Sequence, residues 1–527
     1  MISFVSRNKL IMTLSMDEML HRIGSLGIYQ TRLLLILSWV LLFNIGYPYL
    51  LLTFLIYEPP WKCVANSTVC TVTGDIKPGD ANYNFRCDIL REEWEFTGER
   101  TSVITEFELI CNKVSLSILS PTLFFIGTLV SDCFCGILSD KIGRKPVMLI
   151  FGFLVSVFSV SAALSHSHWL YTFCRFFVGL SYSATFIPMY TLSMEFVGVD
   201  RHHISGTIIW FSWAFTVMLL AGIAYLFNDW RAVTLAGAVP GFLILICWWF
   251  IPESIRFLLL KDKTAEAEKT LRKIAKINGR EYPNEPLNNF VFNKEQRQGS
   301  ILDLVRTKKM LHITVSLFFI SLTATVVYLA VTITSPSLGG NMYLNVFLFG
   351  LVEIPANVVG MITIKRFGRR NVISVSMIVA AAGAFLVILL TIHDPGNHKG
   401  YTIGRISTSL LAKMAVVISY ITVVMFTAEC YPSIIRSTGL AVSNNAGVDI
   451  GGIISPLVIK LDHFHPLLPY SIIGGSALLA GILCLTLKET GHKPTMETFN
   501  DEAWIEKPCL NDQNGEEYSN QNRETDV

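Results

Sequence analysis

The feature that most constrains this chain is a series of apolar runs, each long enough to cross a lipid bilayer. A spanning helix needs about 20 consecutive, mostly apolar residues. Six such runs precede a polar stretch at 252–309, and six follow it. They lie near 33–57, 114–138, 147–164, 169–194, 205–226, 232–251, 310–333, 342–363, 371–392, 406–428, 436–459 and 468–487. The sequence therefore predicts an all-α integral membrane protein with twelve transmembrane helices in two six-helix lobes.

The composition supports this prediction and narrows the function. Only 16% of the 527 residues are charged and 52% are hydrophobic, whereas soluble proteins carry about 25% charged residues. A net charge of +2 argues against nucleic acid as a partner. The chain contains no glycine-rich phosphate loop, no nucleophile elbow and no Cys/His spacing typical of a metal site. We therefore expect neither an enzyme nor a bound cofactor or metal.

Basic residues in the short loops predict the orientation, because cytoplasmic loops of membrane proteins are enriched in lysine and arginine. Such residues follow the second run and the eighth run, whereas the loops at 165–168 and 334–341 contain none. Both basic turns, and with an even number of spans both termini, should be cytoplasmic. The predicted order is a cytoplasmic segment (1–32), a first lobe (33–251) with an extracellular insertion (58–111), a cytoplasmic loop (252–309), a second lobe (310–487) and a cytoplasmic tail (488–527).

The two halves also resemble each other. The turn at 136–145 (GILSDKIGRK) has a counterpart at 362–370 (ITIKRFGRR). Glu195 after the fourth run corresponds in the same way to Glu429 after the tenth. A basic turn alone could merely fix the topology. Two matched turns indicate an internal repeat, which is typical of secondary transporters.

The first of these turns resembles the signature loop of the major facilitator superfamily. That resemblance implies the major facilitator fold, with a charged cytoplasmic latch that holds the lobes together when the transporter is open outward. Arg175-Phe-Phe-Val-Gly179 similarly resembles the Arg-xxx-Gly motif of the fourth helix. Lys365 replaces Asp140 in the second turn, so we expect a weaker or differently paired latch there. The candidate latch residues are Asp140, Arg144, Arg175, Glu195, Glu429 and Arg436.

Several ordered motifs narrow the resemblance to the organic cation, carnitine and organic anion transporters. They are Met16-Asp-Glu, Gly24-Ser-Leu-Gly-Ile-Tyr-Gln30, Trp249-Phe-Ile-Pro-Glu-Ser254, Leu351-Val-Glu-Ile-Pro355 and Thr427-Ala-Glu-Cys-Tyr-Pro432. The resemblance implies a polyspecific organic cation transporter of the plasma membrane, facilitative and electrogenic, that works by alternating access. A carnitine-like zwitterion carrier, with or without sodium coupling, and an organic anion exchanger remain alternatives.

The insertion at 58–111 fits an extracellular location. It contains Cys63, Cys70, Cys87 and Cys111, and cysteines outside the cell usually pair. Four cysteines allow three connectivities, and the sequence does not choose among them; four free thiols are the alternative. Relatives in the family often carry six cysteines here, so two bridges are a departure. Asn66-Ser-Thr68 is a predicted N-glycosylation site.

Two carboxylates within apolar runs are candidates for a substrate site. Asp449 lies 13 residues from Arg436, about 20 Å deep, and Glu353 lies 12 residues from Lys365, about 18 Å deep. A charge at the membrane centre costs at least about 2.5–3.5 kcal/mol, so each should line a polar cavity or be paired. The alternative for both is an internal ion pair, with Lys413 as the obvious partner.

The family resemblance favours Asp449 as the cation anchor. Cation transporters of the family carry aspartate in this motif, whereas anion and carnitine transporters carry arginine. Asp449 sits about one residue later than the family pattern when it is counted from Arg436. Lys413 resembles a lysine of the anion and carnitine members, which keeps a zwitterionic substrate open.

Aromatic side chains should complete the site, because a cation over an aromatic face gains about 0.5–2 kcal/mol. By motif position Phe186, Tyr190 and Tyr328 match cavity-lining residues of cation transporters, and Phe215 is a weaker match. The alternative for each is packing or contact with lipid. Ser183 stands where some cation transporters carry lysine.

The chain ends in Glu524-Thr-Asp-Val527, which resembles the peptide ligands of PDZ domains. Such domains add the peptide as a β-strand and bind its terminal carboxylate. Val527 would fill the apolar pocket and the Thr525 hydroxyl, two residues upstream, would make a hydrogen bond. A chance ending on a polar tail is the alternative.

Overall fold

The computed structural model describes residues 16–65, 67, 69–70, 72–76, 80, 82–98, 100–283, 301–393, 398–432, 435–465 and 467–490. Ten helical segments within these residues are long and apolar enough to cross a membrane. The two other predicted runs are also helical. One is α8 (His168–Glu195), and the other is the continuous stretch α19 (Arg436–Gly439), η8 (Leu440–Asn445) and α20 (Ala446–Ile459). The predicted all-α membrane architecture is therefore confirmed.

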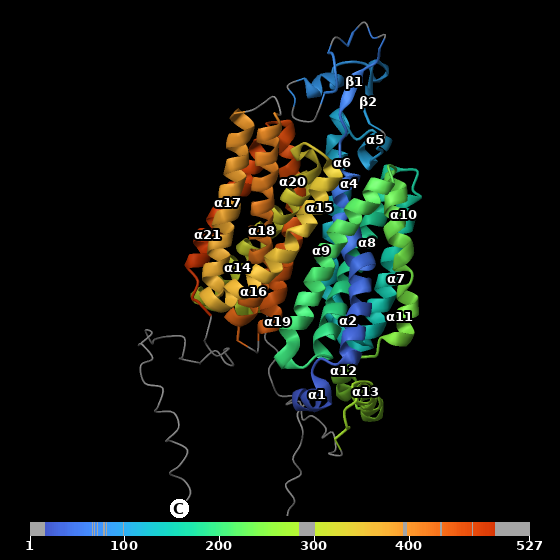
Figure 1. Cartoon of the computed structure of the whole chain (residues 1–527), viewed down its shortest axis with the longest axis vertical. Helices are drawn as coiled ribbons and strands as arrows, with labels where there is room; N and C mark the ends of the chain where they lie inside the picture. The colour runs from blue at the N-terminus through green and yellow to red at the C-terminus, as the bar shows by residue number, and fades with distance from the viewer. Residues whose placement is uncertain are drawn as a thin grey trace, which may run out of the picture.

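The helices form two lobes that stand side by side (Figure 1). The first lobe contains α2 (Ile28–Val40), η1 (Leu41–Gly46), α3 (Tyr47–Leu50), α4 (Leu52–Leu55), α6 (Val114–Ile142), α7 (Arg144–Ala163), α8, α9 (His202–Leu226), α10 (Trp230–Gly241) and α11 (Ile244–Phe250). The second contains α14 (Lys308–Thr334), α15 (Met342–Leu351), α16 (Glu353–Phe367), α17 (Arg369–His393), α18 (Lys399–Cys430), α19, η8, α20 and α21 (Leu468–Leu485). We call the side with the 58–111 insertion the outer side and the side with the two basic turns the inner side.

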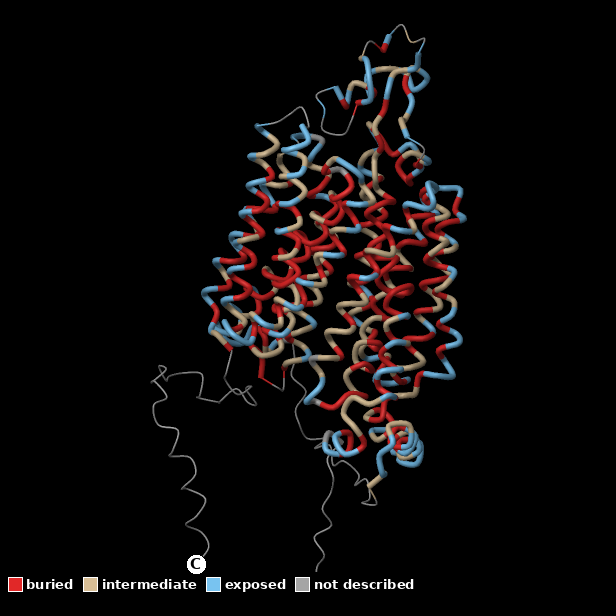
Figure 2. Tube along the Cα trace, viewed as in Figure 1, coloured by how far each residue is buried: buried red, intermediate tan, exposed pale blue. Residues whose placement is uncertain are grey.

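The outward faces of both lobes are apolar. Exposed residues follow the outer edges of the helices, whereas buried residues face the interior (Figure 2). The exposed side chains include Leu35, Ile150, Val375, Leu411 and Ile482. Soluble proteins rarely expose apolar patches of this extent, so the surface fits contact with lipid.

The insertion at the outer side is held by a short sheet and two disulfides. Strand β1 (Trp61–Cys63) pairs antiparallel with β2 (Trp94–Phe96), and the rings of Trp61 and Trp94 are buried against each other. The bridges join Cys63 to Cys70 and Cys87 to Cys111, which is one of the three connectivities left open above. The predicted glycosylation site Asn66 lies outside the described residues.

Three short helices cover the inner side of the first lobe: α1 (Met16–Gly24), α12 (Ile255–Leu260) and α13 (Thr264–Ile277) (Figure 1). Asn278, directly after α13, links them to α2. Its Oδ1 accepts a hydrogen bond from the Tyr29 backbone N–H at 3.0 Å, and its Nδ2 donates to the Ile23 carbonyl at 3.0 Å. A Cβ at Gly27 would lie 2.3 Å from the Asn278 side chain. This close approach explains the second glycine of the Gly24–Gln30 motif.

The inner turn of the first lobe is built around a capping glutamate. Gly143, at φ +121°, joins α6 to α7. Glu253 accepts hydrogen bonds from the backbone N–H groups of Arg144 (3.0 Å) and Lys145 (3.2 Å). These N–H groups have no partner within the helix, and a carboxylate at a helix N-terminus is favourable.

The second lobe repeats this arrangement. Gly368, at φ +80°, precedes α17, and Glu489 accepts from the backbone N–H groups of Arg369 (2.9 Å) and Arg370 (3.1 Å). The internal repeat therefore extends from the sequence to the hydrogen bonds of both turns. Glu489 was not predicted, although it follows the twelfth run much as Glu253 follows the sixth.

Candidate functional site

Asp449 points from the second lobe toward the first because of a π-helical segment. A π-helix bonds residue i to i+5 and therefore accommodates an extra residue. Segment η8 has this form and lies between Arg436 and Asp449, so it absorbs the one residue by which the sequence departs from the family spacing. Asp449 is 7% exposed, and its Oδ1 lies 2.8 Å from Thr128 Oγ1 on α6.

The glycines after Asp449 permit close packing between helices. A Cβ at Gly451 would lie 2.6 Å from the Leu322 carbonyl oxygen on α14, and one at Gly452 would lie 2.3 Å from the Phe125 ring on α6. Small residues allow helices in a membrane to approach closely. The run Asp449-Ile-Gly-Gly452 thus places a carboxyl group where both lobes meet.

A second carboxyl group, Asp132, meets Asp449 from the first lobe. Asp132 lies one turn after Thr128 on α6, and a hydrogen bond links its side chain to Asp449. Asp132 also accepts a hydrogen bond from Ser183 Oγ on α8. Sequence reasoning missed Asp132, although an aspartate in the apolar run at 114–138 was visible.

Aromatic rings lie near this carboxyl pair. Tyr49, Tyr182 and Tyr420 all lie within electrostatic range of Asp449. Tyr49 stacks on Tyr182 with ring centroids 5.6 Å apart and meets Trp213 edge-on at 5.3 Å. Motif comparison did not single out these four residues.

The predicted aromatic residues Phe186 and Tyr190 continue this series. Phe186 stacks on Tyr182 at 6.3 Å, and Tyr190 lies 6.0 Å from Phe186. The three rings recur every four residues and so share one face of α8. Whether these rings contact a substrate stays a prediction.

Glu353 belongs to a separate, neutral cluster in the second lobe. Lys413 Nζ lies 3.0 Å from Glu353 Oε1, and both side chains are almost fully buried. Lys413 also donates to Thr332 Oγ1 at 2.6 Å. The structure therefore contains the ion pair considered as the alternative for Glu353.

Tyr328 connects this ion pair to the first lobe. Its hydroxyl donates to Glu353 Oε1 at 2.9 Å and accepts from Trp213 Nε1 at 2.8 Å. Lys413 Nζ lies 3.3 Å from the centroid of the Tyr328 ring. The face of the Tyr328 ring is therefore occupied by a cation of the protein itself, the Lys413 ammonium group.

The placement of Phe215 in the site is wrong. Phe215 is 52% exposed and lies two residues, about 200° around α9, from the buried Trp213. It shares its helix face with Gly222, where an added Cβ would meet nothing within 4 Å. Phe215 therefore lies on the open face of α9, as expected for contact with lipid.

The inner charges pair within each lobe. Arg144 lies 3.3 Å from Asp140 and 3.4 Å from Glu195 in the first lobe. Arg369 lies 3.0 Å from Glu429 in the second lobe, which repeats the Arg144–Glu195 pair. Lys365 stands where Asp140 gives Arg144 a second partner, so the second turn has the weaker set of ion pairs. Arg436 begins α19 at the inner end of the eleventh segment.

Arg175 does not belong to this inner group. It lies 20 residues before Glu195 on the same helix, about 30 Å away. Its guanidinium donates to the Pro48 carbonyl and lies over the Phe124 ring. The prediction that Arg175 belongs to the latch was wrong, because it rested on the charge of this residue and did not consider its depth in the membrane.

A mostly buried ion pair joins the lobes at the outer side. Glu58, after α4, lies 3.2 Å from Lys460 Nζ, after α20, and also pairs with the buried Arg86 of the insertion. Burial opposes ionisation of Glu58, yet Lys460, Arg86 and hydrogen bonds from Arg86 and Tyr83 together lower its pKa from 4.5 to about 2. Glu58 and Lys460 line one small pocket between the lobes. We call these three residues the outer clasp.

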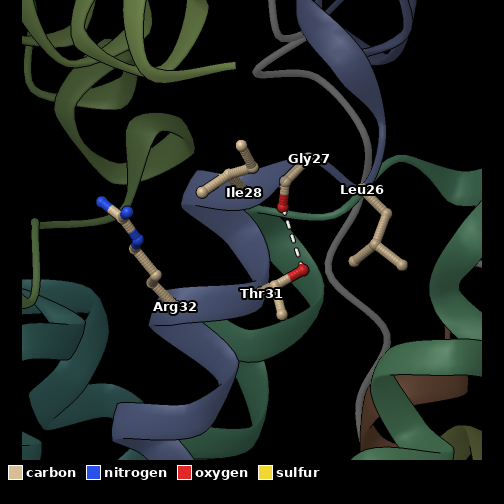
Figure 3. A pocket seen from close by; sticks show the side chains of 5 residues that line it. All are labelled: Leu26, Gly27, Ile28, Thr31 and Arg32. Atoms are coloured by element: carbon tan, nitrogen blue, oxygen red, sulfur yellow. Dashed lines mark hydrogen bonds between the residues drawn. The ribbon is translucent and has the colours of Figure 1, made fainter.

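Another pocket lies at the inner start of α2. It is lined by Leu26, Gly27, Ile28, Thr31 and Arg32, and the Thr31 hydroxyl donates to the Gly27 carbonyl at 3.0 Å (Figure 3). It is distant from the carboxyl pair and contains no convergent polar side chains. We assign it no role in binding.

Comparisons with known proteins agree with this arrangement. The family described as "sugar (and other) transporter" matches residues 79–501. The organic cation transporter protein of Drosophila melanogaster is 33% identical over 77% of this chain and 75% of its own length. The organic cation/carnitine transporter 2 of Rattus norvegicus is 32% identical over 77% of this chain and 73% of its own. Among solved structures, the proton:xylose symporter XylE covers 89% of this chain and 98% of its own with a TM-score of 0.61 at 17% identity, which shows a common fold.

Proposed function

This chain belongs to the organic cation and carnitine transporters of the major facilitator superfamily, and on that premise we propose that it carries small organic cations of varied shape across the plasma membrane. It is a membrane transporter and not an enzyme. The observation that carries the proposal is the carboxyl pair Asp132–Asp449 between the lobes, with aromatic rings nearby.

The charges of the described residues favour a cation over an anion. Asp449 has no lysine or arginine beside it, whereas the buried Lys413 is neutralised by Glu353. A substrate carboxylate would therefore find no uncompensated cation near Asp449. Several aromatic faces attract a cation without imposing one shape, which supports polyspecific binding.

Alternating access provides the mechanism. The outer clasp and the Thr128–Asp449 contact join the lobes at the outer side and at mid-depth. The inner charges pair within their own lobes, and the Asp140 side chain is 70% exposed. We propose that opening to the outside breaks the outer clasp and lets the inner turns join the lobes instead.

We propose that transport is electrogenic and independent of sodium. A monovalent cation crossing 100 mV gains about 2.3 kcal/mol, which supports an accumulation of roughly 50-fold. No coupling ion is then required.

A carnitine-like zwitterion is the second candidate substrate. It is favoured by the rat relative, whose name includes carnitine, and by Lys413. Breaking the Lys413–Glu353 pair during the cycle would free a cation for a substrate carboxylate.

Uptake by cells that express the chain distinguishes these candidates. Labelled tetraethylammonium, carnitine and para-aminohippurate are compared with and without sodium at constant membrane voltage. We expect tetraethylammonium uptake that persists without sodium. Uptake of carnitine alone, lost when sodium is replaced, would support the zwitterion carrier, and uptake of para-aminohippurate alone would support the anion exchanger.

We also propose that the inner side is cytoplasmic and that the C-terminal tail binds a PDZ scaffold. Thr525 and Val527 lie outside the described residues, so the sequence carries this proposal. A peptide of the last ten residues should bind a PDZ domain, and one alanine added after Val527 should abolish binding by displacing the terminal carboxylate. Unchanged binding and membrane distribution of the extended protein would contradict this role.

A further inference from the structure

Two carboxyl groups from opposite lobes touch each other at mid-depth. Asp132 belongs to α6 and Asp449 to α20, and a hydrogen bond links the two side chains. Asp449 is more than nine-tenths buried, and its Oδ2 accepts no hydrogen bond from any hydroxyl or N–H group of the described residues. The oxygen is therefore available to a proton or to a substrate.

The hydrogen bond between Asp132 and Asp449 requires a proton. Ionised carboxylates only accept hydrogen bonds, so a contact between two of them needs one carboxyl group to be protonated. Thr128 Oγ1 donates to Asp449 Oδ1 at 2.8 Å but supplies no proton between the two carboxyl groups. The contact between Asp132 and Asp449 therefore lacks a donor unless the pair holds one proton.

Within the described residues, no cationic side chain faces the pair and takes the place of that proton. The titratable groups that face the pair are Tyr49 on α3, Cys135 on α6, Tyr182 on α8 and Tyr420 on α18. All four are neutral when protonated. Ser183 Oγ donates to Asp132 without contributing charge. Two carboxylates in contact do not both ionise readily, so the empty pair carries one negative charge.

We propose that Asp132 is a specificity-determining residue that matches the charge of the site to the charge of the substrate. With a monocation, the pair keeps its proton, which one carboxyl group donates to the other. A dication whose two positive charges lie close together displaces that proton into water and binds between two carboxylates. One proton leaves as the second positive charge enters, so the site stays neutral in both complexes. This inference rests on the proposed function and adds compact organic dications to its substrates.

Uptake measured at several pH values tests the inference. The probes are tetraethylammonium, a bis-quaternary ethane with two carbons between its trimethylammonium groups, and a bis-quaternary decane with ten. Their charges are permanent, so pH acts only on the protein. Raising the pH removes the competing proton, and the uptake ratio of the short dication to tetraethylammonium should rise by up to about tenfold per pH unit. The long dication cannot place both charges on one pair, so its ratio should rise less.

Two variants test whether Asp132 causes the rise of the uptake ratio with pH. In Asp132→Asn the site retains one carboxyl group, so the short dication should lose its rise with pH. Cys133→Ser is the control, because this exposed neighbour on α6 donates only to the Leu129 carbonyl, and it should behave like the wild type. Surface biotinylation corrects each rate for the amount of protein at the membrane, and the wild-type comparison does not depend on any variant.

The outcomes separate this inference from the proposed function. If wild-type cells take up tetraethylammonium but the ratio of short dication to monocation is flat across pH, the shared proton has no role and the inference is wrong. The same conclusion follows if Asp132→Asn keeps the wild-type rise. If wild-type cells take up none of the three probes, the proposed cation transport fails and this inference fails with it.

Discussion

Lys413→Met should destabilise the protein severely, because it leaves Glu353 as an uncompensated buried charge. The ammonium and carboxylate groups lie 3.0 Å apart with side-chain exposures of 0% and 3%. Removing one member of a buried pair costs about 3–5 kcal/mol, a large share of a typical total stability of about 5–15 kcal/mol. At about 2–4 °C per kcal/mol for a domain the size of one lobe, the melting temperature should fall by about 6–20 °C.

Removing both charges should recover most of the lost stability. The double variant Glu353→Gln/Lys413→Met keeps a side-chain oxygen that can accept from the Tyr328 hydroxyl, and it contains no unpaired charge. Replacing a buried pair by neutral side chains is often nearly neutral for stability. We therefore expect a coupling of at least about 2 kcal/mol between the two sites.

Thermal unfolding of the detergent-purified protein, followed by size-exclusion chromatography, measures these differences. Lys365→Met is the control, since this lysine is exposed at the inner turn, and its effect should stay within about 0.5 kcal/mol. A double variant that is as unstable as the sum of its single variants would refute the ion-pair reasoning. Loss of tetraethylammonium uptake by a stable double variant would instead show that Glu353 serves transport.

Three further predictions concern the outer clasp and the packing of α20. Ile118 lines the pocket between the lobes, so a cysteine placed there reports whether the outer side is open. Lys460→Gln should increase severalfold the rate at which a membrane-impermeant thiol reagent labels this cysteine. An unchanged rate would mean that the outer clasp does not hold this side closed. Because the pKa of Glu58 is lowered to about 2, its contribution to stability is fully present above pH 4.5 and is lost only as the pH falls toward 2. The ratio of the labelling rates with and without Lys460→Gln, in which the reactivity of the thiol itself cancels, should therefore be the same at pH 5.5 and pH 7.5. Gly451→Ala should destabilise the protein by about 1–3 kcal/mol, since its Cβ would lie 2.6 Å from a backbone oxygen. Gly475→Ala is the control and should not destabilise the protein, because its Cβ would meet nothing within 4 Å. Equal melting temperatures for the two variants would contradict the close packing.

Apolar runs and repeated motifs made most of the fold predictable. Each span depends on about 20 consecutive residues and on the absence of charge, so a local reading of the sequence suffices. The basic turns recur in both halves, and the structure shows the same pairing of glutamate with backbone N–H groups in each. Contacts between residues that are far apart in the sequence were harder to predict, as the disulfides show. Four cysteines specify no partner until the strands around Trp61 and Trp94 bring them together.

The candidate site was predicted only in part, because it depends on how helices of different lobes are rotated. A single aspartate in an apolar run, such as Asp132, does not reveal that its partner Asp449 lies in the other half of the chain. Phe215 was placed wrongly because proximity to the site along a helix says little about which face a side chain occupies. The π-helical segment η8 shows the same limit, since one extra residue would have turned Asp449 away from the interface in a regular α-helix.

The central claim is that Asp449 anchors an organic cation while it crosses the membrane. Voltage-clamped cells that express the wild type should carry an inward current when tetraethylammonium is added, and the current should persist when lithium replaces sodium. Asp449→Arg places a cation in the same position and should reduce this current at least about tenfold, which corresponds to a loss of about 1.4 kcal/mol or more, with an unchanged amount of protein at the cell surface. A normal tetraethylammonium current through Asp449→Arg would contradict the claim.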